Sequence, residues 1–152
     1  YGATAGYLYA SGRAGERFAV RNSGAHVVVE GCGSNGCEYM TGGVAVVLGR
    51  IGANFGAGMT GGMAYVYDPQ GVAEDFMNSE TVLTCAVAHP HWEAQLRDLI
   101  QRHHAETGSR IAERILGNWV AERANFLQIC PKEMLPHLAH PLSNEAEKVP
   151  AE

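Results

Sequence analysis

A glycine-rich segment occurs twice in this sequence, 19 residues apart. Residues 40–47 read MTGGVAVV and residues 59–66 read MTGGMAYV. In both copies a pair of glycines precedes a run of β-prone apolar residues. A short unit that recurs at a fixed period is typical of a solenoid, in which each unit buries its apolar residues by stacking on the next one.

The same period extends over residues 1–71. Anchor glycines recur at steps of 18, 19 and 19 residues, and a second glycine stands nine positions after each anchor. The anchors are Gly6, Gly24, Gly43 and Gly62, and the second glycines are Gly15, Gly33, Gly52 and Gly71. Twelve positions after the first three anchors stand Phe18, Gly36 and Phe55, which suggests an aromatic column with one gap. The pattern predicts a mainly β fold, a right-handed parallel β-helix with rungs of about 19 residues and glycines at the corners.

The predicted strands are apolar at consecutive positions, so both of their faces should be buried. One face fills the interior of the coil. The other face, which carries Tyr9, Tyr65 and Tyr67, should be covered from outside. Either the second half of the chain or a separate domain could supply this cover.

The pattern changes near residue 72, since 17 of the 19 glycines precede this point and 19 of the 27 charged residues follow it. We predict β-helix rungs over 1–88, a two-helix extension over 89–135 and a disordered tail over 136–152, which has three prolines. Thr81–Val87 should form one last strand, and residues 126–131 should be extended. The chain has no initiator Met and begins within the repeat, so we expect a fragment, the C-terminal part of a larger solenoid.

The two predicted helices each have an apolar face. The first should begin at His89-Pro90 and the second at a cap formed by Thr107 or Ser109, continuing to about Ala124. The expected faces are Trp92, Leu96, Leu99, Ile100 and His103 in the first helix, and Ile111, Ile115, Trp119 and Val120 in the second.

Charge and composition exclude several kinds of partner. The net charge is -5 and no cluster of Lys and Arg is present, so we expect no binding to nucleic acid. The apolar runs are much shorter than a membrane span, so no membrane partner is expected. The four cysteines, Cys32, Cys37, Cys85 and Cys130, have no spacing typical of zinc or iron–sulfur sites. We expect free thiols and a cytoplasmic location.

Several motifs imitate functional sites. Gly31–Gly36 and Gly56–Gly61 both match G-x-G-x-x-G, but a dinucleotide site needs a helix after the third glycine, and the segment after Gly36 is too short for one. The histidine pairs His89/His91 and His103/His104 lack the spacing of a zinc protease. The solenoid acids Glu16, Glu30, Glu38 and Asp68 suggest no catalytic pair, and Arg13, Arg17 and Arg21 are expected at a surface or an interface. We therefore predict no catalytic, cofactor-binding or metal-binding residue in this chain.

Longer segments resemble a known family. They are residues 12–24 (GRAGERFAVRNSG), 29–31 (VEG), 36–43 (GCEYMTGG), 54–55 (NF), 58–62 (GMTGG) and 64–68 (AYVYD), followed by matches around Leu99-Ile100, His103, 107–109, 115–116, Trp119 and 131–134. Together these segments closely resemble the C-terminal β-helix (GXGXG) domain of the large (alpha) subunit of bacterial NADPH-dependent glutamate synthase. The resemblance covers about residues 1–135. Similar β-helices occur in a subunit of formylmethanofuran dehydrogenase, but the two-helix extension favours glutamate synthase.

The resemblance implies a parent enzyme that transfers the amide nitrogen of L-glutamine to 2-oxoglutarate and yields two L-glutamates, an ammonia-assimilating step. Such an enzyme uses FMN, a 3Fe-4S cluster and electrons from NADPH, and a small flavoprotein (beta) subunit delivers the electrons. None of its catalytic or cofactor-binding residues matches a position here, so the resemblance implies a structural scaffold that contacts other domains of the same large subunit and binds no cofactor itself.

Two alternatives remain open: an independent β-helix enzyme, or a module whose exposed first rung pairs with a partner strand. The uncapped N-terminal rung also predicts self-association of the isolated chain.

Overall fold

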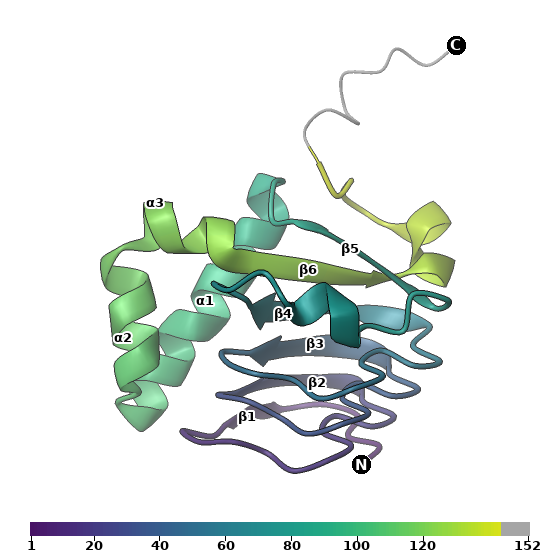
Figure 1. Cartoon of the computed structure of the whole chain (residues 1–152), viewed down its shortest axis with the longest axis horizontal. Coiled ribbons are helices and arrows are strands. Elements are labelled where there is room, and N and C mark those ends of the chain that lie inside the picture. Colours follow the sequence, from purple (N-terminus) through teal and green to yellow (C-terminus); the bar gives the residue numbers. More distant parts are fainter. Residues whose placement is uncertain (144–152) are drawn as a thin grey trace.

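The computed structural model describes residues 1–143, which fold around one six-stranded mixed sheet with the strand order β1-β2-β3-β4-β6-β5 (Figure 1). The strands are β1 (Tyr7–Tyr9), β2 (Ser23–Val29), β3 (Thr41–Val47), β4 (Gly61–Tyr67), β5 (Val82–Ala86) and β6 (Phe126–Pro131). The α-helices are α1 (Pro90–Thr107), α2 (Arg110–Gly117) and α3 (Trp119–Glu122), and short 3-10 helices are η1 (Ala73–Phe76), η2 (Arg123–Asn125) and η3 (Lys132–His137).

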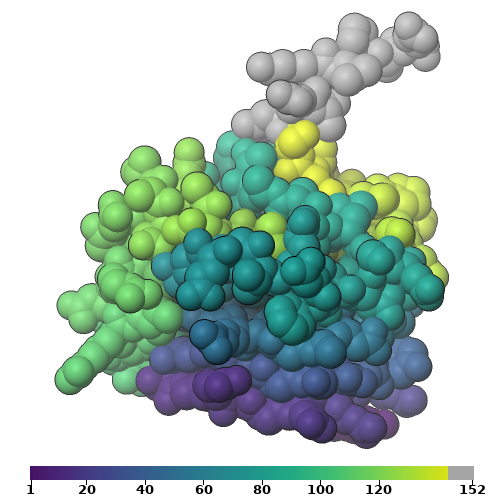
Figure 2. Space-filling model, in the orientation of Figure 1, coloured from purple at the N-terminus to yellow at the C-terminus, as the bar shows by residue number. Residues whose placement is uncertain are grey.

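Strands β1 to β4 pair in parallel and form the predicted β-solenoid. Tyr7 pairs with His26, His26 with Val44 and Val44 with Met63, so equivalent residues follow one another at steps of 19, 18 and 19. The prediction of rungs of about 19 residues is confirmed. In Figure 2 the rungs are visible as layers that change from purple to blue as the chain advances.

One anchor of the predicted register is displaced. The residue before each paired position is Gly6, then Ala25, Gly43 and Gly62, so Ala25 occupies the place that the spacing assigns to Gly24. The reason is a register shift between Ser23 and His26, where β2 has one residue more than β3. A local bulge of this kind changes the spacing by one residue without altering the period of the fold.

Close stacking of the rungs requires the second glycine at Gly52. The Gly33 N–H donates to the Gly15 carbonyl, and the Gly52 N–H donates to the Gly33 carbonyl, so these three corners lie directly above one another. A Cβ atom on Gly52 would lie 2.4 Å from the Ser34 nitrogen and 2.5 Å from the Gly33 carbonyl carbon. No side chain fits at this distance from backbone atoms.

A second corner repeats an uncommon backbone conformation. In each rung three alternate residues have positive φ angles between 55° and 78°, and most of them are not glycine. They are Arg17, Ala19 and Arg21, then Asn35, Cys37 and Tyr39, then Asn54, Gly56 and Gly58. Most of their N–H groups donate to the carbonyls of adjacent rungs, for example from Arg17 to Ser34 and from Cys37 to Phe18. The ladder thus offsets the steric cost of left-handed residues with side chains.

The gap in the predicted aromatic column is filled. A Cβ atom on Gly36 would lie 2.8 Å from the ring of Phe55, which is fully buried, so the ring of one rung covers the glycine of the rung before it. Phe18 is half-buried and packs against the same interior cluster. The absence of a side chain at Gly36 is therefore what allows Phe55 to enter the solenoid interior.

The central strands of the sheet, β2, β3, β4 and β6, are buried on both faces, as predicted. One face, with Ala45, Val47 and Val66, fills the solenoid interior. The opposite face, with Tyr65 and Tyr67, packs against a cluster that contains the predicted apolar face of α1. The second half of this chain therefore covers the outer face, and the helices lie together on one side of the solenoid (Figure 1).

After β4 the chain leaves the stack. Strand β6 pairs antiparallel with β4, and β5 pairs antiparallel with β6 at the edge of the sheet. Strand β5 confirms the last strand expected at Thr81–Val87, but it does not stack on β4 as a further rung. The extension assigned to 89–135 likewise contributes a strand as well as helices.

The first helix begins where it was predicted. The side chain of His89 caps α1 by accepting from the His91 N–H, and Pro90 stands in the first turn. The side chain of Ser109 caps α2 by accepting from the Ala112 N–H.

The predicted second helix is shorter than expected, because α2 ends at Gly117 and Asn118 leaves the helical conformation before α3 begins. The prediction that Val120 lies on the apolar side is wrong, since this break turns Val120 to solvent and leaves it 82% exposed.

Residues 136–143 differ from the predicted disordered tail. Leu138 and Leu142 pack against the cluster on the helix-covered face, and the Trp92 indole N–H donates to the Pro141 carbonyl over 3.0 Å. The apolar contacts of Leu138 and Leu142 hold this segment in place. The rest of the predicted tail, 144–152, lies outside the described residues.

Candidate functional site

Three acidic residues of the solenoid form structural contacts with other groups of the chain. Glu30, which follows β2, pairs with His103 of α1 over 2.9 Å. Asp68 accepts from the N–H groups of Val72 and Ala73 over 3.0 Å each and so caps η1. Glu38 accepts from the side-chain amide of Asn35. Glu30 and Asp68 therefore have separate partners, and because Val29 is level with Val66 through Val47, Asp68 stands one position further along its rung than Glu30.

The Glu30–His103 pair joins the solenoid to the helical half. The His103 side chain is completely buried, whereas that of Glu30 is 19% exposed. The ring of Tyr9 lies 6.2 Å from the His103 ring, and the second ring nitrogen, Nδ1, has no hydrogen-bond partner among the described residues. A buried imidazole with one hydrogen bond positions α1 on the end of β2. The sequence places His103 on the apolar face of α1 but contains no signal for its acidic partner.

The other histidines gather near the C-terminal segment. The rings of His91 and His140 stack with centroids 3.8 Å apart, and the His89 ring lies 5.6 Å from that of His140. Burial lowers the pKa of His91, and the neighbouring His140 and His89 lower it further. The group is a packing contact between α1 and residues 138–142. Within residues 1–143, no three His, Cys, Asp or Glu side chains are close enough to hold a metal ion.

The four cysteines are free thiols, as expected. Cys32 and Cys37 are buried in the solenoid interior, and Cys130 is buried between the sheet and the helices. Burial raises the pKa of Cys32 and of Cys130 to about 11, so both thiols remain protonated at neutral pH. Because the thiolate is the nucleophile, these environments do not activate cysteine chemistry.

The two nucleotide-like glycine motifs are solenoid corners. Residues 34–39, at the end of the first motif and just after it, form turns, and β3 begins at Thr41, so no helix follows to hold a pyrophosphate. The second motif ends at Gly61, the first residue of β4. Gly31–Gly36 and Gly56–Gly61 thus both lead into a strand of the next rung and not into a helix.

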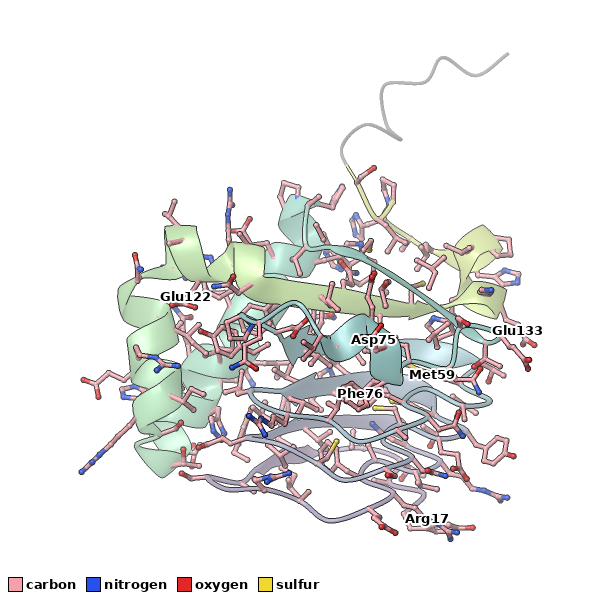
Figure 3. The ribbon with its side chains drawn as sticks, viewed as in Figure 1. Arg17, Met59, Asp75, Phe76, Glu122 and Glu133 are labelled. Carbon is pink, nitrogen blue, oxygen red and sulfur yellow. The ribbon has the colours of Figure 1, made fainter. Side chains whose placement is uncertain are left out.

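Arginines of the solenoid lie at its surface. Arg13, Arg17 and Arg21 are exposed, and Figure 3 shows Arg17 on the corner opposite the helices. The Arg21 guanidinium lies 5.8 Å from the ring centroid of Tyr1 and 6.0 Å from that of Tyr39. Cation–π contacts of exposed groups add about 0.5–1 kcal/mol each.

The hydrogen bonds between the sheet and the helices, and the buried Gln128, were not predicted. The Tyr65 hydroxyl donates to Gln95 of α1 over 2.7 Å, and the Tyr67 hydroxyl donates to Glu122, whose position Figure 3 marks. Gln128 is completely buried in β6, and neither atom of its amide has a partner among the described residues. Gln128 of β6 pairs with Tyr65 of β4, and this pairing places the amide beneath the helices. The sequence alone does not show which residues of the two strands pair.

A groove of about 540 Å³ lies beside η1. It is lined by the corner after β3, the loop after β4, η1 and Ile111 of α2. Most of its walls are apolar, with Arg50, Asp68 and Asp75 as the charged residues. Its volume lies within the range of about 300–1,000 Å³ that is usual for ligand pockets, but few polar groups converge in it.

These features define a class of protein: a β-solenoid domain whose rungs stack through glycine corners and whose outer face is covered by its own helices. Residues 1–132 match the sequence model of the family described as the GXGXG motif, and the chain belongs to this family. No helix within residues 1–143 is both long and apolar enough to span a membrane.

The chain is similar to large chains named glutamate synthase. It is 61% identical over 142 residues to the glutamate synthase (NADPH) large chain of Azospirillum brasilense, which covers 93% of this chain and 9% of that protein. It is 55% identical over 131 residues to the ferredoxin-dependent enzyme of Pyropia yezoensis (86% and 8%) and 52% identical over 133 residues to the NADH enzyme of Schizosaccharomyces pombe (88% and 6%). The predicted resemblance is confirmed, and the chain spans less than a tenth of the length of these relatives.

Proposed function

We propose that this chain is a structural scaffold domain of a glutamate synthase and performs no chemistry itself. The parent enzyme would convert L-glutamine and 2-oxoglutarate to two L-glutamates with FMN, a 3Fe-4S cluster and electrons from NADPH. The observation that carries the proposal is the match of at least 86% of this chain to a small part of each glutamate synthase compared.

The names of the relatives support a role that is independent of the electron donor. The enzymes compared are named for NADPH, NADH and ferredoxin, yet their identity to this chain stays between 52% and 61%. A domain that recognised the donor would be expected to differ among them. We infer that donor recognition and catalysis belong to other parts of the polypeptide or to a small flavoprotein subunit.

The physical character of the solenoid supports the scaffold role. Backbone hydrogen bonds run from rung to rung at the strands and at both corners, and the central strands of the sheet are buried on both faces. Charged groups that could act on a substrate are used internally, as with Glu30 and Asp68. Such a stack resists bending and suits a spacer that holds other domains at a set distance.

We further propose that another rung of the same polypeptide covers β1. A Cβ atom on Gly15 would meet no atom within 4 Å, and Gly15 has no positive φ, whereas its equivalent Gly52 is required by the backbone of the rung before it. If another rung precedes the first one, its backbone would crowd position 15 as Gly33 and Ser34 crowd position 52, and a glycine would be required there. In the isolated chain the same edge would favour self-association by strand pairing.

The first test uses the purified chain alone. We expect no flavin absorbance in the visible region and no release of ammonia from L-glutamine. Flavin bound in a 1:1 ratio after purification would refute the absence of a cofactor site.

A second test uses the full-length enzyme with Leu96→Ala, which removes a fully buried side chain from α1. We expect thermal inactivation at a lower temperature, because such truncations cost about 2–5 kcal/mol, with kcat and KM almost unchanged while the enzyme is folded. Val120→Ala, at an exposed position of α3, is the matched control. A large loss of kcat without loss of thermal stability would contradict a purely structural role.

A further inference from the structure

The groove beside η1 arises because the last rung is longer than the others. Phe55 pairs with Met77, which stands 22 residues later, whereas Val44 pairs with Met63 after 19 residues. The three additional residues lie in the loop after β4. Gly71, predicted to stack on Gly52, instead donates its N–H to the Asp68 carbonyl, so this corner stands away from the rung before it.

The loop has a defined shape that keeps the groove open. The Asp68 carboxylate accepts from the N–H groups of Val72 and Ala73, and Ala73 is buried in the solenoid interior. The groove is therefore held by hydrogen bonds at one wall and by η1 at the other. It is a built feature of the last rung and not a packing defect.

The walls of this groove expose apolar side chains. Val72 is 46% exposed and Phe76 is 38% exposed, and both line the groove. Figure 3 shows Phe76 and the neighbouring Asp75 on η1, on the viewer's side of the solenoid. Arg50 and Asp75, which also line it, form no ion pair with any described residue. An apolar hollow with one free charge of each sign at its walls is suited to a segment of protein.

We propose that this groove receives an apolar segment from the remainder of the same polypeptide, flanked by charges that meet Arg50 and Asp75. The inference rests on the proposed function as a scaffold domain. It commits to this occupant because more than nine-tenths of the length of each relative lies outside the matched region, and a tethered segment has a high effective concentration. The docked segment would cover Val72 and Phe76 and would join the last rung to a neighbouring domain.

The test places the photoreactive residue benzoylphenylalanine in the full-length polypeptide at position 76, or at position 39 or 120 as comparison sites. Tyr39 lies on the solenoid corner and Val120 on α3, both are exposed, and neither lines the groove. After irradiation, cross-linked peptides are mapped by mass spectrometry. We expect cross-links from position 76 to the remainder of the same polypeptide, in at least fivefold higher yield than from position 120.

The outcomes separate this inference from the proposed function. Cross-links from position 39 or 120 to the remainder without any from position 76 would overturn the groove inference and leave the scaffold role intact. Cross-links from position 76 to a second copy of the chain would overturn the proposed occupant. The absence of cross-links from all three positions would count against both.

A substitution provides an independent readout. Phe76→Asp in the full-length polypeptide should increase the rate at which a protease releases this domain at least threefold, while Val120→Asp should leave the rate unchanged. Equal rates for both variants and the parent polypeptide would also overturn the inference.

Discussion

Gly15 and Gly52 form a matched pair that tests the close stacking of the rungs. Both stand at the same corner, and neither has a positive φ. In Gly52→Ala the new methyl group would lie 2.4–2.8 Å from backbone atoms of Gly33 and Ser34, whereas in Gly15→Ala it would meet no atom within 4 Å. The two substitutions thus differ in steric contact and in little else.

The expected magnitudes follow from this contrast. Replacing glycine by alanine where the backbone permits stabilises by about 0.4–1 kcal/mol, through the entropy of the unfolded chain. Overpacking typically costs about 1–3 kcal/mol, and backbone atoms cannot rotate away as a side chain can. Gly52→Ala should therefore lower the free energy of unfolding by about 2–3 kcal/mol relative to Gly15→Ala.

Urea unfolding of the chain measures this difference. With a typical slope of about 2 kcal/mol per molar urea, the midpoint of Gly52→Ala should fall about 1 M below that of Gly15→Ala. Equal midpoints would refute the claim that the corner requires glycine. In the full-length polypeptide Gly15→Ala should also become destabilising, and a neutral effect there would contradict the proposed rung over β1.

Three other predictions concern polar side chains. Gln128→Met should leave stability unchanged or increase it, because it removes an unpartnered buried amide; a loss above about 1 kcal/mol in urea unfolding would contradict this. Glu30→Ala should cost about 1–3 kcal/mol, since His103 then loses its hydrogen bond, and Glu30→Gln should recover part of the loss; no effect of either variant would disprove the role of the pair. The pKa of His91 in the folded chain lies below the ordinary value of 6.5. As the pH falls below about 6.5, His91 therefore takes up a proton in the unfolded chain before it does so in the folded chain. The free energy of unfolding should then decrease until the pH has fallen through the lowered pKa of the folded state. Trp92 fluorescence should report release of the segment around Pro141 in that range but less so in His91→Phe, and an identical pH profile would contradict the assignment.

Much of the solenoid could be predicted from sequence because its contacts repeat. Each rung uses the same local solution, so glycines such as Gly33 and Gly52 mark the corners at a constant period. The helix starts at Pro90 and Ser109 were also predictable, since capping depends on residues adjacent in the chain. Interactions between residues close in sequence, or repeated at a constant period, can therefore be predicted from the sequence.

Other features depend on residues far apart in sequence. The pairing of Glu30 with His103 spans 73 positions, and no local pattern indicates it. The antiparallel placement of β5 and β6 was not predicted, because a short apolar strand does not specify its neighbour. The packing of Leu138 and Leu142 also depends on a surface that exists only after the sheet and α1 have assembled.

By itself, the sequence determined the rung period, the glycine corners, the two buried faces of the strands and the resemblance to glutamate synthase, because all of these depend on repeated or contiguous residues. Only the tertiary structure decided that the chain's own helices cover the sheet, which residues pair beneath them and where the last rung opens. The groove beside η1 shows the difference: its three extra residues are visible in the sequence only once the pairing of Phe55 with Met77 is known. The register of two segments is defined only when they pair, and so it can be read only from the folded molecule.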